Sequence, residues 1–221
     1  MSPAKLLKSS SCVVSSIISL DDLFLDLPHP NPNIRMDACV VMSENYFDEA
    51  FPRLLDLLND SDPTVYRTAV KGLGVFGHRV LSPLLDLFNT TDNSTVKACC
   101  IKAFVQVSVN FPESVFPEQA ITALKLALND PNPVVSQSAL MTLGYFSKLE
   151  HEKERVIPIL IQACNSSNIA HVQSAVMSLA EVQSSQVDQC FMSMINSEST
   201  DPLIEEILES SISRRQGLFG N

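Results

Sequence analysis

The chain has 221 residues, of which 45% are hydrophobic and 18% charged, so it can bury a sizeable core and is not disordered overall. Its formal net charge is -10 with only 15 lysines and arginines, which argues against a nucleic-acid binder because phosphate neutralisation needs clustered cations. Its six cysteines form no CxxC pair and its four histidines are scattered, so the sequence predicts neither a zinc site nor a disulfide framework.

The first 19 residues, MSPAKLLKSSSCVVSSIIS, are predicted to be a flexible leader. Serines interrupt its apolar run, which is too broken for a membrane span and a poor match to the hydrophobic part of a signal peptide. We therefore expect no membrane insertion and a cytoplasmic protein. Residues 20–212 are predicted to form a single helical domain. A flexible tail over 213–221 is expected after it, because SRRQGLFGN carries two arginines and two glycines.

One pattern recurs along the predicted domain: a turn rich in Asn, Asp and Pro leads into an apolar helix built around a central residue, usually a small one. It is plain in DPTVYRTAVKGLG, which begins at Asp62, and in NPVVSQSALMTLG, which begins at Asn132. The central residues of the successive copies, the sixth a weaker match, are Ala38, Ala69, Cys100, Ala139, Ala175 and Leu208. Their steps of 31, 31, 39, 36 and 33 residues are typical of stacked helical pairs.

Several of these helices are preceded by another amphipathic segment, with apolar residues at i, i+3 and i+4. The predicted first helices are 52–58, 82–88, 120–128 and 157–163. Asp62 is placed to cap the second helix that follows it, and Pro63 suits a first helical turn because no backbone N–H is missed there. Gly72, Gly74 and Gly144 are expected to let neighbouring helices approach closely. No stretch alternates with period two, so no sheet is predicted.

The sequence therefore predicts an all-α fold, an α-solenoid of about five to six HEAT-like helical repeats. The shared pattern D-x-x-V-(R/x)-x-x-A-(V/L)-x-x-L-G resembles the HEAT repeat. One helix pair of this kind cannot bury its apolar face alone, and the stacking of neighbours supplies the core. There is no GxSxG, P-loop, GxGxxG or HExxH motif, so neither a standard catalytic triad nor a nucleotide site is expected.

Basic residues gather on the second helices at positions that project away from the predicted core. Two residues after each centre, the successive repeats carry Val40, Lys71, Lys102, Met141 and Met177. With the positions two and three before each centre, the predicted ligand or partner groove comprises Arg35, Tyr66, Arg67, Lys71, Lys97, Lys102, Met141 and Met177. Arg and Lys would bind carboxylates, while Met and Tyr would cover flat apolar surface, so an anionic, partly apolar ligand is expected. The alternative is that exposed helix positions carry charge without binding anything.

Two further side chains are candidates for chemistry. Cys99 and Cys100 are adjacent on a helix and point to different faces, and Cys100 takes the place of the packing alanine in the core. Cys99 could take a ligand covalently or could be an inert buried thiol. His78 follows Gly77 at a turn, where it could act in proton transfer or be a surface histidine. The residues themselves identify neither a catalytic group nor a metal ligand.

Three stretches carry a resemblance to a known family: residues 29–77, NSTVKACCIKAFVQV over 93–107, and NSESTDPLIEEILESSI over 196–212. They are similar to the HEAT-repeat phycobilin lyases of the E/F type found in cyanobacteria. Within that family they are most similar to the CpeZ type, which assists phycoerythrobilin attachment to phycoerythrin, and also to the NblB type, linked to phycobilisome breakdown. The resemblance covers nearly the whole chain, and no catalytic residue is carried over from it.

The resemblance implies that a linear tetrapyrrole, phycoerythrobilin or phycocyanobilin, is a substrate ligand, with no tightly bound cofactor. The implied partners are a phycobiliprotein subunit, phycoerythrin first, and a second HEAT-repeat lyase subunit in a heterodimer. Four functions stay open. The chain could be a lyase component that attaches the bilin to a cysteine of a phycobiliprotein, or a non-enzymatic chaperone of that subunit or of a partner lyase. It could also be an NblB-like factor for pigment removal, or a HEAT scaffold unrelated to pigments.

Overall fold

The structure is a computed structural model that describes residues 18–197 and 200–219. The described residues form twelve α-helices, two short 3-10 segments and no strand, which confirms the predicted all-α fold. The first six helices are α1 (Leu20–Leu25), α2 (Pro32–Asn45), α3 (Phe47–Asp56), α4 (Pro63–Val75), α5 (Leu81–Thr90) and α6 (Ser94–Asn110). The second six are α7 (Glu118–Ala127), α8 (Pro133–Phe146), α9 (Lys153–Ala163), α10 (Ile169–Leu179), α11 (Ser185–Ile195) and α12 (Pro202–Phe219).

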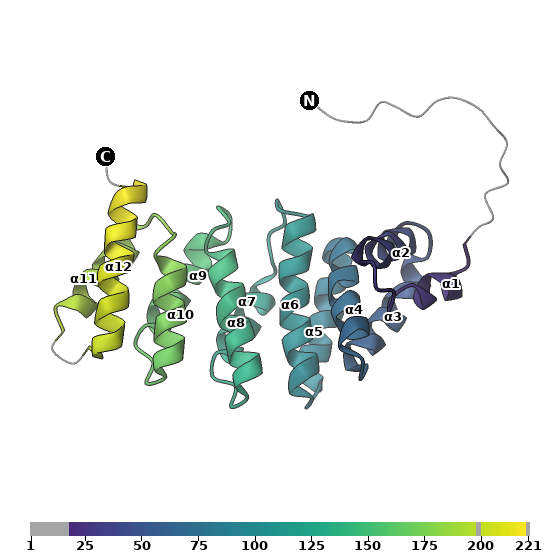
Figure 1. Ribbon diagram of the computed structural model, residues 1–221, viewed down its shortest axis with the longest axis horizontal. Helices are drawn as coiled ribbons and strands as arrows, with labels where there is room; N and C mark the ends of the chain where they lie inside the picture. Colours follow the sequence, from purple (N-terminus) through teal and green to yellow (C-terminus); the bar gives the residue numbers. More distant parts are fainter. Residues whose placement is uncertain (1–17, 198–199, 220–221) are drawn as a thin grey trace, which may run out of the picture.

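The helices stack in consecutive pairs, so that α4, α6, α8, α10 and α12 stand side by side in one layer (Figure 1). Within this layer each helix packs directly on the next, and α5, α7, α9 and α11 form the second layer behind it. Six pairs, from α1/α2 to α11/α12, match the upper number of predicted repeats. This is the architecture of a HEAT solenoid, whose core is shared between neighbouring pairs.

All six even-numbered helices begin with the same cap, an Asn or Asp side chain that accepts a hydrogen bond from the backbone N–H two residues later. Asp62 accepts from the Thr64 N–H at 2.7 Å, as predicted, with Pro63 in the first turn. The equivalent caps are Asn31, Asn93, Asn132, Asn168 and Asp201. Because the cap fixes where each helix starts, it also fixes which residues of that helix face the neighbouring repeats.

The first helices are longer than predicted at two places. Helix α3 begins at Phe47 and α9 at Lys153, several residues before the predicted starts at 52 and 157. Each contains an internal proline, Pro52 or Pro158, near the predicted start. A proline removes one backbone hydrogen bond and strains the preceding turn, but amphipathic packing on both sides of it keeps these helices continuous.

The six predicted central residues are all buried, with exposed fractions of 3% or less. The predicted close approaches also occur: a β-carbon added at Gly72 would lie 2.7 Å from Cys39 Sγ, and one at Gly74 would lie 2.5 Å from Gln106 Cβ. Gly144 is similarly crowded by Ser178. Glycine at these positions therefore allows the close spacing of α2 and α4, of α4 and α6, and of α8 and α10.

Gly74→Ala is expected to destabilise the protein by about 1–3 kcal/mol, because the new methyl group would also meet the Gln106 backbone at 2.8 Å, and backbone cannot rotate away. Gly217→Ala is the matched control, since nothing lies within 4 Å of that position in α12. It should instead raise stability by up to about 1 kcal/mol through helix propensity. Thermal unfolding followed by circular dichroism measures both, and equal effects at the two sites would contradict this packing.

The structure differs from the prediction at the C-terminal end, where residues 213–219 continue α12 and are not a tail. Arg215 is only 6% exposed; its guanidinium binds Asp188 at 2.6 Å and the Leu179 carbonyl at 3.0 Å. These contacts satisfy the carbonyl end of α10 and hold the last turns of α12 in place. Residues 1–17 of the predicted leader lie outside the described residues. Ser19, which was also assigned to the leader, caps α1. Within the described parts, no helix has the length and apolar character needed to cross a membrane.

Candidate functional site

A cavity of about 670 Å³ lies over the even-numbered helices, between α2 and α8. Six of the eight residues predicted for the groove line it: Arg35, Tyr66, Arg67, Lys71, Lys102 and Met141. No aspartate or glutamate is among its fifteen lining residues, although the chain as a whole carries a formal charge of -10. The cavity is therefore a local basic site in an acidic protein, and it favours an anionic ligand.

None of the four cations at this cavity has an anionic partner among the described residues. Arg67, Lys71 and Lys102 are exposed, and no carboxylate of the described residues forms an ion pair with them. The Arg67 guanidinium lies 5.8 Å from the centroid of the Tyr66 ring. Arg35 is half-buried and donates to the backbone carbonyls of His29 at 2.6 Å and Pro30 at 3.0 Å. The positive charges of these four side chains are therefore available to a ligand.

Lys97 and Met177, which the sequence groups with these residues, lie outside the cavity. Lys97 is in the first turn of α6, where its Nζ is 3.6 Å from Asp130 Oδ2 and 6.0 Å from the Phe88 ring centroid. Met177 is on α10, one repeat beyond the cavity, and 52% of it is exposed. Asp130 lies in the turn between α7 and α8, so Lys97 has its partner in the next repeat and not in the cavity.

Apart from Cys99, which was a candidate for covalent ligand binding, sequence reasoning missed the buried floor of the cavity. Thr68, Cys99 and Ser138 each precede a helix centre by one residue, and Thr142 lies one turn after Ser138. Burial raises the pKa of the Cys99 thiol, and the nearby charges of Lys102 and Arg67 oppose that shift. The recurrence at one position before the centre was visible in the sequence, but small polar residues there are equally compatible with core packing.

Two other lining residues, Gln106 and Tyr145, could have been predicted from helical periodicity. Gln106 and Tyr145 come four residues after Lys102 and Met141, so they lie one helical turn further along the same face. A second cavity of about 440 Å³ adjoins the first and shares Lys102, Ser138 and Met141 with it. Its other lining residues are Pro133, Val134, Gln137, Asn168, Ala170 and His171. The basic site thus continues toward α10 as a mainly apolar groove.

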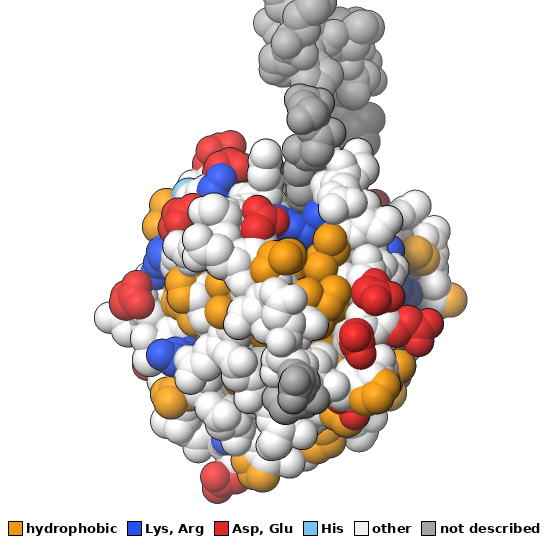
Figure 2. Space-filling model, turned by 90° about the vertical axis from the view of Figure 1, so that its left-hand side faces the viewer, with side chains coloured by type: hydrophobic (Ala, Val, Ile, Leu, Met, Phe, Trp, Pro, Cys, Tyr) orange, Lys and Arg blue, Asp and Glu red, His pale blue; other side chains and the backbone are white. Residues whose placement is uncertain are grey.

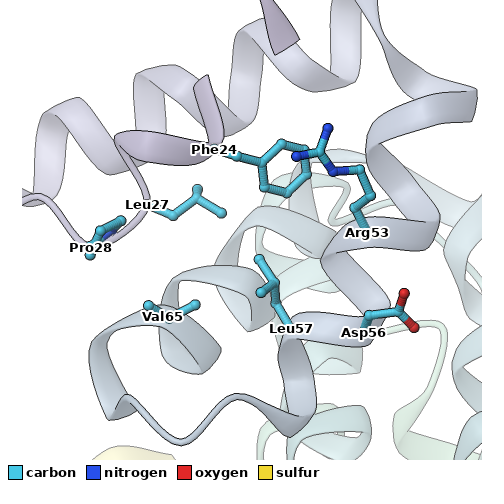
Figure 3. Close-up of a pocket in the computed structure, with 7 residues that line it drawn as sticks. All are labelled: Phe24, Leu27, Pro28, Arg53, Asp56, Leu57 and Val65. Atoms are coloured by element: carbon cyan, nitrogen blue, oxygen red, sulfur yellow. The ribbon is translucent and has the colours of Figure 1, made fainter. Parts of the chain in front are cut away.

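A separate cavity of about 420 Å³ lies at the N-terminal end, where α1 faces α3 and α4 (Figure 3). Phe24, Leu27 and Leu57 line it with the aliphatic part of Arg53. The Arg53 guanidinium stacks 3.8 Å from the Phe24 ring centroid and pairs with Asp21 at 2.9 Å. Because this charge is already compensated, the N-terminal cavity lacks the unpaired cations of the basic site.

His78 has a partner that the sequence did not place. Its Nε2 forms a short hydrogen bond with the Ser114 hydroxyl, and His151 Nε2 lies 2.8 Å from the Ser114 backbone carbonyl oxygen. Ser114 is only 6% exposed, and both contacts fix the segment between α6 and α7. This arrangement is structural. In the described parts of the chain, no group of three or more His, Cys, Asp or Glu side chains could hold a metal ion.

The C-terminal end of the stack exposes apolar side chains. Figure 2 looks onto this end and shows hydrophobic side chains gathered near the middle of the face. A shallow cavity of about 320 Å³ lies here between α11 and α12, lined by Phe191, Met192, Ile212 and Arg215 among others. An exposed apolar face of this kind suits a protein partner.

Among the described cysteines, Cys190 is expected to react first with iodoacetamide. Cys190 is half-buried, whereas the other described cysteines are buried. A hydrogen bond with Cys164 also lowers the Cys190 pKa, while burial raises the Cys39 and Cys100 pKa values to about 12. The thiolate is the reactive form, so a lower pKa gives more of it at neutral pH. Peptide mapping by mass spectrometry measures the order of labelling. Cys164→Ala should slow labelling of Cys190, and faster labelling of Cys39 would contradict this order.

Comparison with known proteins identifies the family to which the chain belongs. HEAT repeats match residues 20–104 and 121–211. The bilin biosynthesis protein CpeZ of Synechococcus sp. (strain WH8020) is 82% identical over 186 residues, which cover 84% of this chain and 100% of that protein. An uncharacterized phycocyanin operon protein Z of Pseudanabaena tenuis (strain PCC 7409) is 34% identical over 204 residues, covering 92% of this chain and 98% of that protein.

Among solved structures, the complex of CpcE and CpcF of phycocyanin lyase from Nostoc sp. PCC7120 has the same fold. The TM-score is 0.56 at 18% sequence identity, over 74% of this chain and 98% of the matched chain. The repeats, the fold and the sequence identity agree, and the chain belongs to the HEAT-repeat family of bilin biosynthesis proteins that includes CpeZ.

Proposed function

We propose that this protein holds a linear tetrapyrrole bilin in the basic cavity and assists its attachment to a cysteine of a phycobiliprotein, as a component or a chaperone of a bilin lyase. The observation that carries this proposal is the cavity itself, with four cationic side chains and no carboxylate in a chain of charge -10. The relative named as a bilin biosynthesis protein, 82% identical, supports bilin as the ligand class.

A bilin suits this site in charge, size and surface. Its two propionates require cations, and Arg67, Lys71 and Lys102 are unpaired at the rim. The volume of about 670 Å³ lies within the range of roughly 300–1,000 Å³ that small-molecule sites occupy. Met141 and Tyr66 offer the polarisable and aromatic cover that conjugated rings prefer.

The residues on this face can bind and orient a bilin, and they suit that role better than acid–base catalysis. The lining residues contain no histidine, aspartate or glutamate that could transfer a proton. A fixed orientation and partial exclusion of water can still direct attachment, because the acceptor thiol then meets one carbon of the bilin and side reactions are disfavoured.

The proposed partners are a phycobiliprotein subunit, with phycoerythrin first, and a second HEAT-repeat lyase subunit, and we expect all three to meet in the cytoplasm. The apolar C-terminal end supports a protein partner. The matched phycocyanin lyase, whose structure is a complex of two different chains, makes a heterodimer the arrangement to test first. The bilin proposed first is phycoerythrobilin, with phycocyanobilin as the second choice.

An attachment assay tests the proposal. Apo-phycoerythrin subunit and phycoerythrobilin are mixed with and without this protein and with the partner lyase, and covalently bound bilin is read by zinc-enhanced fluorescence on a denaturing gel. The protein is expected to raise the yield or the uniformity of the adduct. Loss of bilin from an already coloured subunit would indicate pigment removal instead, and no effect on either substrate would overturn the proposal.

A further inference from the structure

Two hydroxyl groups on the floor of the basic cavity have no hydrogen-bond partner among the residues that the structure describes. Thr68 of α4 is 3% exposed and Thr142 of α8 is 1% exposed, and both line the cavity. Neither hydroxyl forms a hydrogen bond with any described residue. The neighbouring Ser138 hydroxyl, in contrast, donates to the Val134 carbonyl of its own helix at 2.7 Å.

These hydroxyls must open into the cavity. Within the described residues, no side-chain oxygen or nitrogen that is sealed from solvent lacks a hydrogen-bond partner. The small exposed areas of Thr68 and Thr142 therefore include their oxygens, and the cavity is the space that these residues line. A nearly buried hydroxyl without a partner reduces stability, so such groups are typical of sites where a ligand supplies the missing hydrogen bond.

The cavity thus has two chemically different levels. Lys71 and Lys102 are exposed at its rim, whereas Thr68 and Thr142 are buried at its floor, with Cys99 of α6 on the same level. The two lysines each follow their helix centre by two residues. Thr68 and Cys99 each precede theirs by one residue, and Thr142 lies one turn after the equivalent position in α8. A ligand that fills the cavity therefore meets cations on one edge and hydroxyls on the other.

The central rings of a bilin carry their propionates on the edge opposite to their ring nitrogens. A bilin that enters edge-on can place its carboxylates against the rim while its nitrogens face the floor. A threonine hydroxyl suits either state of such a nitrogen, because it accepts from a pyrrole N–H and donates to an unprotonated nitrogen. The side walls, which include Met141 and Tyr145, would then cover the ring faces.

We propose that Thr68 and Thr142 are specificity-determining residues that hydrogen-bond the nitrogen-bearing edge of the tetrapyrrole. This inference rests on the proposed function, because it takes a bilin as the ligand of the same cavity. It adds the orientation of that ligand and a recognition element that depends on no charge. The rim attracts any dicarboxylate of suitable size, whereas the floor selects for one with hydrogen-bonding ring nitrogens.

Thr68→Val and Thr142→Val, singly and together, test the inference, since valine keeps the shape and removes the hydroxyl. Phycoerythrobilin is titrated into each purified protein and its visible absorbance gives the affinity. The double variant is expected to bind about 10–100-fold more weakly, from two lost hydrogen bonds. Its affinity should depend on salt as that of the wild type does, and the bound bilin should show a shifted absorption band. Without bilin, the variants should unfold at the same temperature as wild type or higher.

Ser108→Ala is the matched control, because this buried hydroxyl of α6 lies outside the cavity lining and already donates to the Val105 carbonyl at 2.9 Å. It should leave the affinity for phycoerythrobilin unchanged. If wild type binds the bilin and the double valine variant binds it equally well, the inference fails while the proposed function stands. A clear loss of thermal stability in the valine variants without bilin would also overturn it, by assigning the hydroxyls a structural role. If wild type does not bind the bilin, the proposed function itself fails.

Discussion

Replacing Lys71 and Lys102 together by glutamate is expected to weaken phycoerythrobilin binding by about 30–1,000-fold. Both lysines are exposed at the rim of the basic cavity and neither pairs with a carboxylate of the described residues. Each reversal turns an attraction for a propionate into a repulsion, worth about 1–2 kcal/mol at a solvated position, and each 1.4 kcal/mol is a factor of ten. Absorbance titration of the purified protein measures the affinity.

The fold should tolerate this change, since the two side chains make no ion pair that the substitution would break. The control is Lys125→Glu, the same charge reversal at an exposed residue of α7 in the other layer. Because it reverses one charge, its affinity is compared with that of Lys71→Glu and of Lys102→Glu alone. It should bind bilin as wild type does. Binding to wild type should also weaken with added salt, because exposed charges are screened. Equal weakening by Lys125→Glu would show that overall charge, and not the cavity, governs binding.

Glu152→Ala is expected to cost about 2–4 kcal/mol of stability, from an unsatisfied buried N–H and a lost charge-assisted hydrogen bond. The Glu152 carboxylate is fully buried, where it accepts from the Phe116 backbone N–H at 2.7 Å and pairs with Arg155 at 2.7 Å. Arg155 in turn donates to the Phe116 carbonyl at 2.9 Å. Glu152 thereby fastens the segment before α7 to the start of α9. Alanine would leave the Phe116 backbone N–H without its partner and would reduce Arg155 to its exposed pair with Glu118 at 2.8 Å.

Glu150 provides the contrast two residues away. It pairs with Lys153 at 2.5 Å, but its side chain is 85% exposed. Glu150→Ala should therefore change the free energy of unfolding by less than about 1 kcal/mol, as for other exposed ion pairs. Thermal unfolding should separate the two variants by several degrees, since about 1 kcal/mol shifts the midpoint by roughly 2–4 °C at this chain length. Similar midpoints would mean that Glu152 does not hold this junction.

The repeat pattern predicted the fold because each copy carries its own local signals. Asp62 and the five equivalent caps begin the second helices, and the central residues, such as Ala69 and Ala139, are all buried. The same register places Lys71, Lys102 and Met141 on one open face, since neighbouring repeats stack with their helices aligned. Rows of side chains across a solenoid can therefore be predicted from one position in each repeat.

Contacts that cross between repeats were not predictable in this way. Lys97 occupies a row position as regular as that of Arg67, but its partner Asp130 lies in a turn 33 residues further along the chain. The end of α12 was predicted to be a flexible tail because glycine and arginine are common in such segments. Arg215 is instead buried and donates to the Leu179 carbonyl of α10. Thr68 and Thr142 were missed because threonine is compatible with a buried core position. Only the packing shows that their hydroxyls have no partner among the described residues.

The most direct test of the central claim is the visible absorbance of the protein purified at physiological salt from a host that makes phycoerythrobilin. A bilin held in the basic cavity predicts a visible band near one chromophore per chain, and its loss in the Lys71→Glu, Lys102→Glu double variant. A colourless wild-type protein from pigmented cells, or a band that is equally strong in the double variant, would contradict the claim.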